Sequence, residues 1–443
     1  METILLYVLG ILIMVIGLGL SIALHEIGHL VPAKAFGVKV GQYMIGFGPT
    51  VFSRRRGETE YGLKALPLGG YISMSGMYPP GKDGTASRTA STGFFQTLVQ
   101  DARTASAETI DEGAEARTFY RLPVLKRIVI MLGGPFMNLV IAVTLFAVLL
   151  CGFGTAQNSS TVGFVNQCVL PAGSTETSCP ADATDSPAYA AGMRNGDRIV
   201  SIDGVAMTDG DQVTSVLRAS PGEELDVVVE RAGAELTLEL TPTLSERYVT
   251  DDLGATVTGA DGQPETQQVG FVGIGFATEK VRQPVTAVLP AVGDNIVHVA
   301  GVIVTLPQRM VTVAQAAFSG AERDPNGPVG VIGVGRLAGE FASLDSVPVV
   351  DRAAYLLSLL GSLNIALFVF NLVPLMPLDG GHVAGALIEA VRRGVAKLFR
   401  RPDPGPVDTA KVIPLTFVVV IGLGAMSLLL AYADIVNPIR LFG

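Results

Sequence analysis

The sequence predicts a polytopic α-helical membrane protein of about four transmembrane helices, with a membrane-associated β-hairpin sheet and an inserted, extracytoplasmic α/β domain. Three observations lead to this fold class. The 443 residues are 49% hydrophobic and only 16% charged, with a mean hydropathy of +0.46, which is too apolar for a wholly soluble chain. Four apolar segments approach the ~20 residues that a bilayer requires. A long, acidic, turn-rich stretch separates the second of them from the third.

The apolar segments predict four transmembrane helices, at Leu5–Leu30, Ile128–Phe153, Tyr355–Leu378 and Val412–Ala433. With their flanks they correspond to segments 1–30, 125–153, 353–379 and 412–434. The first is not expected to be a removable signal peptide, because no Lys or Arg precedes its apolar run and that run is too long.

The charge distribution predicts the orientation of these helices. Residues 31–127 carry 13 Lys and Arg against 8 Asp and Glu, and residues 380–411 carry 6 against 3, whereas residues 152–350 carry 10 against 24. Because cytoplasmic loops are enriched in Lys and Arg, we expect a multi-pass protein of the cell membrane with both termini and the acidic insert outside the cytoplasm. The net charge of −9 comes from this insert, so no nucleic-acid partner is expected.

The first helix ends in the motif His25-Glu26-Ile27-Gly28-His29. In a helix, His25 and His29 lie one turn apart on the same face, so both imidazoles can bind one zinc ion. Glu26 lies beside them and can act on a water without being a ligand. Two incidental buried histidines are the alternative, but ionisable groups at membrane depth are costly and favour a functional interpretation.

Segment 31–124 is predicted to form a cytoplasmic β-hairpin sheet and a mobile loop. Strands are expected at Val38–Ile45, Glu60–Leu66 and Gly70–Met74, with Gly46-Phe47-Gly48 after the first. A sheet so close to the metal motif is expected to form a wall of an active-site cleft; a plain hairpin is the alternative. Residues Pro79–Ala116 are polar and are expected to be mobile, apart from a short amphipathic helix at Phe94–Val99.

The second helix opens with small residues that permit close helix approach, Gly133 and Gly134. Asn138 is expected to bond across helices, first for packing and only second for catalysis.

Residues 160–245 are predicted to be a soluble module. A short helix, a turn and a strand follow one another over Ser186–Gly204, and two strands flank the Arg231-Ala232-Gly233 turn. This block resembles a bacterial PDZ domain, a module that binds extended peptide ends by adding a strand to its sheet. A structural β domain without a ligand is the alternative. Cys168 and Cys179 fall in this exterior module, where an oxidising compartment favours a disulfide between them.

Segment 246–352 is predicted to contain an extracytoplasmic linker and an amphipathic helix at Ile296–Phe318. This helix is either a surface helix or a marginal extra span. We favour the surface helix, because a fifth span would break the charge-based topology.

The third helix is expected to supply the rest of the metal site. Asn371 precedes Pro374, Pro377 and Asp379-Gly380, which places a lone carboxylate at the end of an apolar segment. A catalytic zinc needs three protein ligands and an open position, which His25, His29 and Asp379 provide. His382 competes for the third place, but it lies beyond the Gly380-Gly381 pair. Residues 380–411 are expected to be a cytoplasmic loop.

In combination these motifs look like the site-2 protease family of zinc intramembrane proteases. The resemblance rests on the motifs at His25–His29, Gly46–Gly48, Pro67-Leu68-Gly69-Gly70-Tyr71 and Asn371–Gly380, with the PDZ-like insert between them. It is closest to the bacterial branch that cleaves membrane-anchored anti-sigma factors already trimmed by a first protease. It implies one catalytic Zn²⁺ bound by His25, His29 and Asp379, with Glu26 as the catalytic residue. It also implies that Asn371 orients the substrate and that the Gly46-Phe47-Gly48 hairpin holds it as an added strand.

The sequence therefore predicts a zinc-dependent intramembrane endopeptidase acting on single-span proteins within the bilayer. A metal transporter or a membrane PDZ scaffold with a structural zinc site are the alternatives, and a zinc enzyme acting on lipids is a third. A transporter would distribute its polar groups along a path through several helices, whereas here they cluster at one depth. A scaffold would not need Glu26, and a lipid enzyme would not need a peptide-binding strand.

Overall fold

The computed structural model describes residues 2–79, 94–111, 113–170, 179–180, 183–249, 263–319, 323–324 and 327–439. The chain forms two compact units, which are described separately. The first comprises Met1–Gly152 and Pro284–Gly443, and the second comprises Phe153–Gln283.

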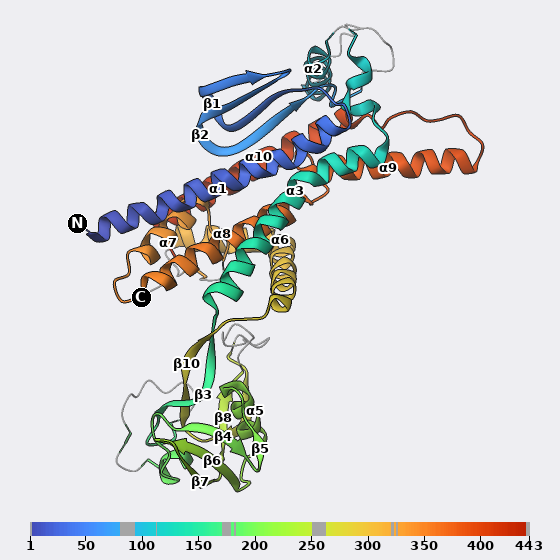
Figure 1. Ribbon diagram of the computed structural model, residues 1–443. Helices are drawn as coiled ribbons and strands as arrows, with labels where there is room; N and C mark the ends of the chain where they lie inside the picture. Colours follow the sequence, from blue (N-terminus) through green and yellow to red (C-terminus); the bar gives the residue numbers. More distant parts are fainter. Residues whose placement is uncertain are drawn as a thin grey trace. The chain divides into compact units, whose positions relative to one another are not determined.

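The first unit is a helical bundle with a small sheet beside α1 (Figure 1). Within the described residues, five helical segments of this unit are long and apolar enough to cross a membrane. They contain α1 (Glu2–Ala35), α3 (Val124–Ala147), α6 (Val288–Ser319), α8 (Val349–Asn371) and α10 (Ile413–Val436). A π-helical turn, Val148–Phe153, extends α3, and 3₁₀ turns at Val285–Ala287 and Thr409–Val412 precede α6 and α10. The expected multi-pass helical architecture is confirmed, whereas the number of spans stays a prediction because α6 meets the same criterion as the four helices expected.

The described part of this unit also contains three shorter helices: α2 (Phe94–Glu108), α7 (Val331–Ala342) and α9 (Asp379–Leu398). Two 3₁₀ turns, Glu115–Arg117 and Phe119–Arg121, connect α2 to α3. The amphipathic helix expected at Phe94–Val99 is thus longer than predicted. Helix α7 was not predicted; it packs on α1, where Ala338 lies against Gly10.

The segment around Asp379 differs from the expectation in two respects. The third helix ends at Asn371, because the prolines that follow, Pro374 and Pro377, are incompatible with a helix interior. Asp379 is instead the first residue of α9, which occupies most of the expected loop 380–411. Helix α9 packs on α3, and the buried side chains of Arg127 and Glu389 lie 2.5 Å apart across that contact.

The sheet is built from two long, bent strands, β1 (Val40–Arg56) and β2 (Thr59–Met74), rather than three separate ones. The residue pairs Tyr43–Ile72 and Tyr43–Tyr61 show that the first half of β1 lies between the two halves of β2. The second half of β1 pairs only with the first half of β2, as in Arg54–Tyr61. The segment Gly70–Met74 is therefore an edge of a four-segment sheet, and it runs antiparallel to the first half of β1.

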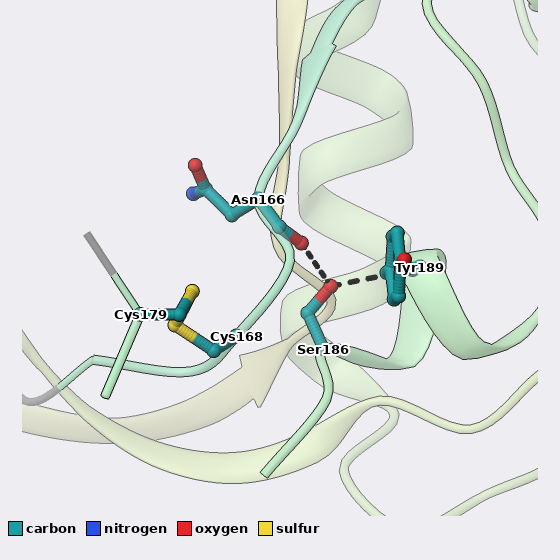
Figure 2. The surroundings of a disulfide bond; sticks show 5 residues. All are labelled: Asn166, Cys168, Cys179, Ser186 and Tyr189. Carbon is teal, nitrogen blue, oxygen red and sulfur yellow. Dashed lines mark hydrogen bonds between the residues drawn. A yellow bond between two sulfur atoms is a disulfide. The ribbon is translucent and has the colours of Figure 1, made fainter. Parts of the chain in front are cut away.

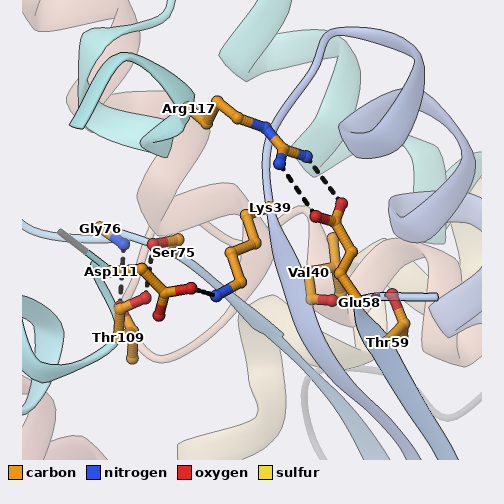
Figure 3. Close-up of polar contacts among 9 residues, drawn as sticks. All are labelled: Lys39, Val40, Glu58, Thr59, Ser75, Gly76, Thr109, Asp111 and Arg117. Atoms are coloured by element: carbon orange, nitrogen blue, oxygen red, sulfur yellow. Dashed lines mark hydrogen bonds and ion pairs between the residues drawn. The ribbon is translucent and has the colours of Figure 1, made fainter. Parts of the chain in front are cut away.

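Polar contacts tie the segment after α2 to this sheet (Figure 3). Arg117 donates to both carboxylate oxygens of Glu58, at 2.9 and 2.6 Å, and Lys39 pairs with Asp111. The Thr109 hydroxyl accepts from the backbone N–H of Gly76 at 3.0 Å. The chain that continues from the edge Gly70–Met74 is thereby fixed in position.

The second unit contains an antiparallel sheet and a separate two-stranded hairpin. The sheet has the order β10-β3-β4-β6-β7, with β5 paired to β4, and the hairpin is β8–β9. Its elements are β3 (Thr155–Val165), α4 (Pro187–Ala190), β4 (Arg198–Ile202), β5 (Val205–Ala206), α5 (Gly210–Ala219), β6 (Leu225–Arg231), β7 (Ala234–Leu240), β8 (Thr243–Tyr248), β9 (Thr266–Phe271) and β10 (Ile274–Val281). A buried cluster that includes Val162, Ile199, Val213 and Val229 forms its core.

This unit is larger than the module expected at 160–245. Strand β3 begins at Thr155, and β10 pairs along it from Val165 to Thr155, so both strands belong to one sheet. Part of the linker expected after residue 246 lies outside the described residues, and the described part contains β9 and β10. The expected helix-turn-strand block corresponds to α4 and β4.

The structure contains a disulfide between Cys168 and Cys179 (Figure 2). Beside it, Ser186 caps α4: its hydroxyl accepts from the backbone N–H of Tyr189 at 3.2 Å and donates to the carbonyl of Asn166. The disulfide and this cap both hold the chain that leads from β3 into α4. Cys151, at the end of α3, is a free cysteine.

Candidate active site

Three potential metal ligands from opposite ends of the chain meet near the end of α1. The Nε2 atoms of His25 and His29 lie 3.2 Å apart, and Oδ2 of Asp379 lies 3.4 Å from the first and 3.3 Å from the second. Helical spacing places the histidines on one face, and the break after α8 turns Asp379 toward them. These are the three residues that the sequence predicts as ligands.

The donor set fits a zinc ion. Zinc–nitrogen and zinc–oxygen bonds of about 2.0–2.2 Å in tetrahedral geometry place neighbouring ligand atoms roughly 3.3–3.6 Å apart. The three observed separations are close to that range. Oδ2 of Asp379 is also buried without a hydrogen-bond partner in the described part of the chain, as expected for an atom whose partner is a cation.

Helix α3 supplies the support behind the histidines. Its backbone approaches α1 so closely that Gly28 and Gly133 lie in contact, and a side chain at Gly134 would collide with both imidazoles. Nδ1 of His29 lies 2.7 Å from the Ile130 carbonyl, and Nδ1 of His25 lies 3.0 Å from the Asn138 amide. The small residues that the sequence identified for helix packing therefore also make room for the metal site.

The three ligands open into a cavity of about 320 Å³. Glu26 lines this cavity and is mostly buried, next to Gly70, where an added side chain would lie 3.0 Å from the Glu26 Cγ. Asn371 and His382 also line the cavity. His382 does not belong to the group of ligand atoms and instead meets the ring of Phe119 edge to face.

The hairpin residues that were expected to bind substrate do not line the cavity, whereas the edge strand beside them does. The cavity is lined by Gly70, Tyr71, Ile72 and Met74, and not by Gly46, Phe47 or Gly48. Phe47 stacks on Tyr71, with ring centroids 6.4 Å apart, so it lies behind the cavity wall. The wall of the active-site cleft expected from this sheet is formed by its Gly70–Met74 edge, and Gly70 lets β2 approach Glu26.

The comparisons with known proteins agree with this geometry. The profile of Peptidase family M50 matches residues 13–400. The chain belongs to this family, the site-2 protease family. It is 32% identical to the zinc metalloprotease Rip1 of Mycobacterium tuberculosis (strain ATCC 25618 / H37Rv), over 98% of this chain and 99% of that protein. The Rip1 of Mycolicibacterium smegmatis is 30% identical over the same shares. A putative zinc metalloprotease of Rhizobium meliloti is 29% identical over 85% of both chains.

The expected enzyme class and cofactor are thus confirmed. The chain is a multi-pass membrane protein and an intramembrane zinc metalloprotease of the M50 family. The group formed by His25, His29 and Asp379 offers a site for the metal.

Proposed function

We propose that this protease cuts the transmembrane segment of single-span membrane proteins, and that its substrates are anti-sigma factors first trimmed by another protease. One observation carries the proposal: the zinc ligands, Glu26 and an edge strand line the same cavity at the end of a membrane helix. A metal transporter or a scaffold needs neither the edge strand nor a carboxylate that is close to the metal group without belonging to it.

The residues of this cavity divide the chemistry among them. His25, His29 and Asp379 would hold zinc, which when bound acts as a Lewis acid and lowers the pKa of a water molecule to about 7. Glu26 takes the proton from the attacking water and delivers it to the leaving amide nitrogen. Asn371, at the end of α8, faces the same space and orients the scissile peptide through its amide.

The edge strand explains how a membrane helix becomes a substrate. A helix hides its amides in its own hydrogen bonds and must unwind before cleavage, which leaves backbone groups without partners in lipid. Among the described residues, Gly70–Met74 pairs with β1 on one side only. An unwound substrate adds to the other side as a strand, directly beside Glu26. Phe47, with Gly46 and Gly48, supports this strand from behind through its contact with Tyr71.

The charge distribution and the disulfide support an orientation with the second unit outside the cytoplasm. Structural disulfides persist in oxidising compartments, and Cys168–Cys179 lies in the acidic unit. Both termini are then exterior, and the catalytic cavity lies nearer the cytoplasmic side.

The packing of α6 supports four spans rather than five. Its first turns pack against Phe146 and Leu150, at the end of α3, and its last turns pack against Leu430 and Ala433, at the end of α10. The first turns of α3 and α10 lie at the end of the bundle that carries the β1–β2 sheet. Helix α3 begins directly after the 3₁₀ turns, and the 3₁₀ turn before α10 contacts α2. These contacts support the proposal that α6 is a surface helix.

The second unit is proposed to be a PDZ-like filter for substrates. Strand β10 is the edge of its sheet, paired with β3 alone in the described residues, so an extended peptide end can add beside it. The unit then selects substrates that have lost their bulky exterior domain.

The test is cleavage in a purified system. The protease in liposomes is incubated with single-span anti-sigma factors, either full-length or trimmed on the exterior side, with and without a zinc chelator. We expect a cut inside the transmembrane segment of the trimmed form, abolished by the chelator and restored by zinc. A cut only outside that segment, or turnover insensitive to the chelator, contradicts the proposed reaction. Equal rates for both forms contradict the filter alone.

A further inference from the structure

Asn138 is a buried amide directed at a metal ligand. It lies on α3 with its side chain wholly buried, and its amide is 3.0 Å from Nδ1 of His25. The amide nitrogen is the atom that faces Nδ1 of His25. The amide oxygen Oδ1 has no hydrogen-bond partner in the described part of the chain.

The requirements of zinc ligation decide how this contact is used. A histidine that binds zinc through Nε2 must be neutral and carry its proton on Nδ1, which then donates to an acceptor. His29 meets this requirement, because its Nδ1 lies 2.7 Å from the Ile130 carbonyl, a group that can only accept. His25 has the Asn138 amide in the equivalent place, and only the oxygen of that amide accepts.

A half-turn of the amide satisfies this requirement at little cost. The two ends of an asparagine amide have nearly the same shape, and their assignment follows from the hydrogen-bond network. Rotation places Oδ1 beside Nδ1 of His25 and breaks no other hydrogen bond, because among the described residues Oδ1 has no partner and Nδ2 has none besides His25.

We propose that Asn138 is a positioning residue that fixes the tautomer and the ring orientation of His25 for zinc binding, by accepting a hydrogen bond from Nδ1. Helix α3 then serves both histidines, through the Ile130 carbonyl and the Asn138 side chain. The inference rests on the proposed role of His25 as a zinc ligand.

Asn364 provides a matched control for this role. It is also wholly buried, and its amide links α8 to α1 by donating to the Ser21 hydroxyl at 3.0 Å and to the Leu360 carbonyl at 2.9 Å. It does not line the catalytic cavity. Replacing either asparagine by leucine removes one buried amide of similar size, but only Asn138 touches a ligand.

The experiment measures the zinc affinity of the metal-free, full-length protein by competition with a chromophoric chelator. We expect Asn138→Leu to weaken zinc binding by about 10–100-fold, the usual effect of removing a group that supports a ligand. Asn364→Leu should lower the unfolding temperature while changing zinc affinity less than about threefold. Asn138→Asp retains an acceptor in the same shape, so it should bind zinc at least as tightly as the wild type.

Two results overturn the inference: wild-type zinc affinity in Asn138→Leu, or equal losses in the Leu and Asp variants at position 138. When the Leu variant does not fold, a loss of zinc affinity in Asn138→Asp overturns the inference, because this variant retains the acceptor. His25→Ala separates this inference from the ligand assignment. If His25→Ala loses zinc and Asn138→Leu does not, only the positioning role fails; if His25→Ala keeps zinc, the ligand assignment itself fails.

Discussion

Gly28 of α1 and Gly133 of α3 lie backbone to backbone, within the metal motif itself. A Cβ atom added at Gly28 would collide with the Gly133 carbonyl, and one added at Gly133 would collide with the Gly28 carbonyl. This contact lets α3 reach the Nδ1 atoms of both histidines. The distance between the two helices is therefore part of the metal site.

Gly28→Ala is expected to push the helices apart and weaken zinc binding. Since both colliding groups are backbone, the bundle must shift, at a cost of about 1–3 kcal/mol of unfolding free energy. Gly19→Ala on the same helix is the matched control, because its Cβ would meet no heavy atom within 4 Å in the described chain. Unfolding temperature and zinc affinity are measured for both variants. Equal behaviour would show that the close approach does not matter.

Asp379 and His382 are expected to differ in zinc binding. Asp379→Ala removes the oxygen that lies 3.3–3.4 Å from both Nε2 atoms, so zinc affinity should fall by more than about 100-fold, beyond the loss typical of a supporting residue. His382→Ala removes a cavity wall and should retain most of the metal. Zinc content after dialysis separates them. The reverse pattern would mean that the third ligand is misassigned.

The second unit is expected to lose stability in acid through Asp197. Burial raises the pKa of this carboxyl, but hydrogen bonds from Arg231, at 2.7 Å, and from the Arg194 N–H outweigh it and hold the pKa below its usual range. A lowered folded-state pKa stabilises the unit above the unfolded value of about 3.9, and that contribution is lost as the pH falls below it.

Hydrogen exchange of β4 and β6 amides in the full-length protein, from pH 6 down to pH 3, measures this effect after correction for intrinsic exchange rates. Arg231→Met should raise the pKa of Asp197 and weaken protection already at pH 6. Arg198→Met, which breaks the exposed pair with Glu230, is the control and should leave protection almost unchanged. If the two variants behave alike, the buried pair does not stabilise the unit.

The sequence was most informative where chemistry restricts residue type. A histidine pair one turn apart and a lone aspartate in an apolar setting are recognisable without coordinates, and the structure brings His25, His29 and Asp379 together. Contacts between distant segments carry no such signal. Nothing in the spacing of Asn138 shows that its amide faces His25.

Some predicted element boundaries differ from those of the structure, because local sequence features there are compatible with more than one structure. Residues 380–411 were expected to be a cytoplasmic loop, yet most of them form α9, where Ala384, Ala386 and Ala390 favour a helix and Glu389 is buried against Arg127. Helix α6 is apolar enough to span the membrane, so its sequence alone does not separate a surface helix from a fifth span. Packing of this kind is decided by tertiary structure.

The most direct test of the account is Glu26→Gln, with zinc content and cleavage measured on the same purified preparation. The substitution keeps His25, His29 and Asp379 and removes only the proton acceptor. We expect one zinc per chain, as in the wild type, and a cleavage rate reduced at least about 10²–10⁴-fold, the usual contribution of a general base. Near-wild-type cleavage with zinc bound would contradict the assignment of Glu26 and, with it, the proposed mechanism.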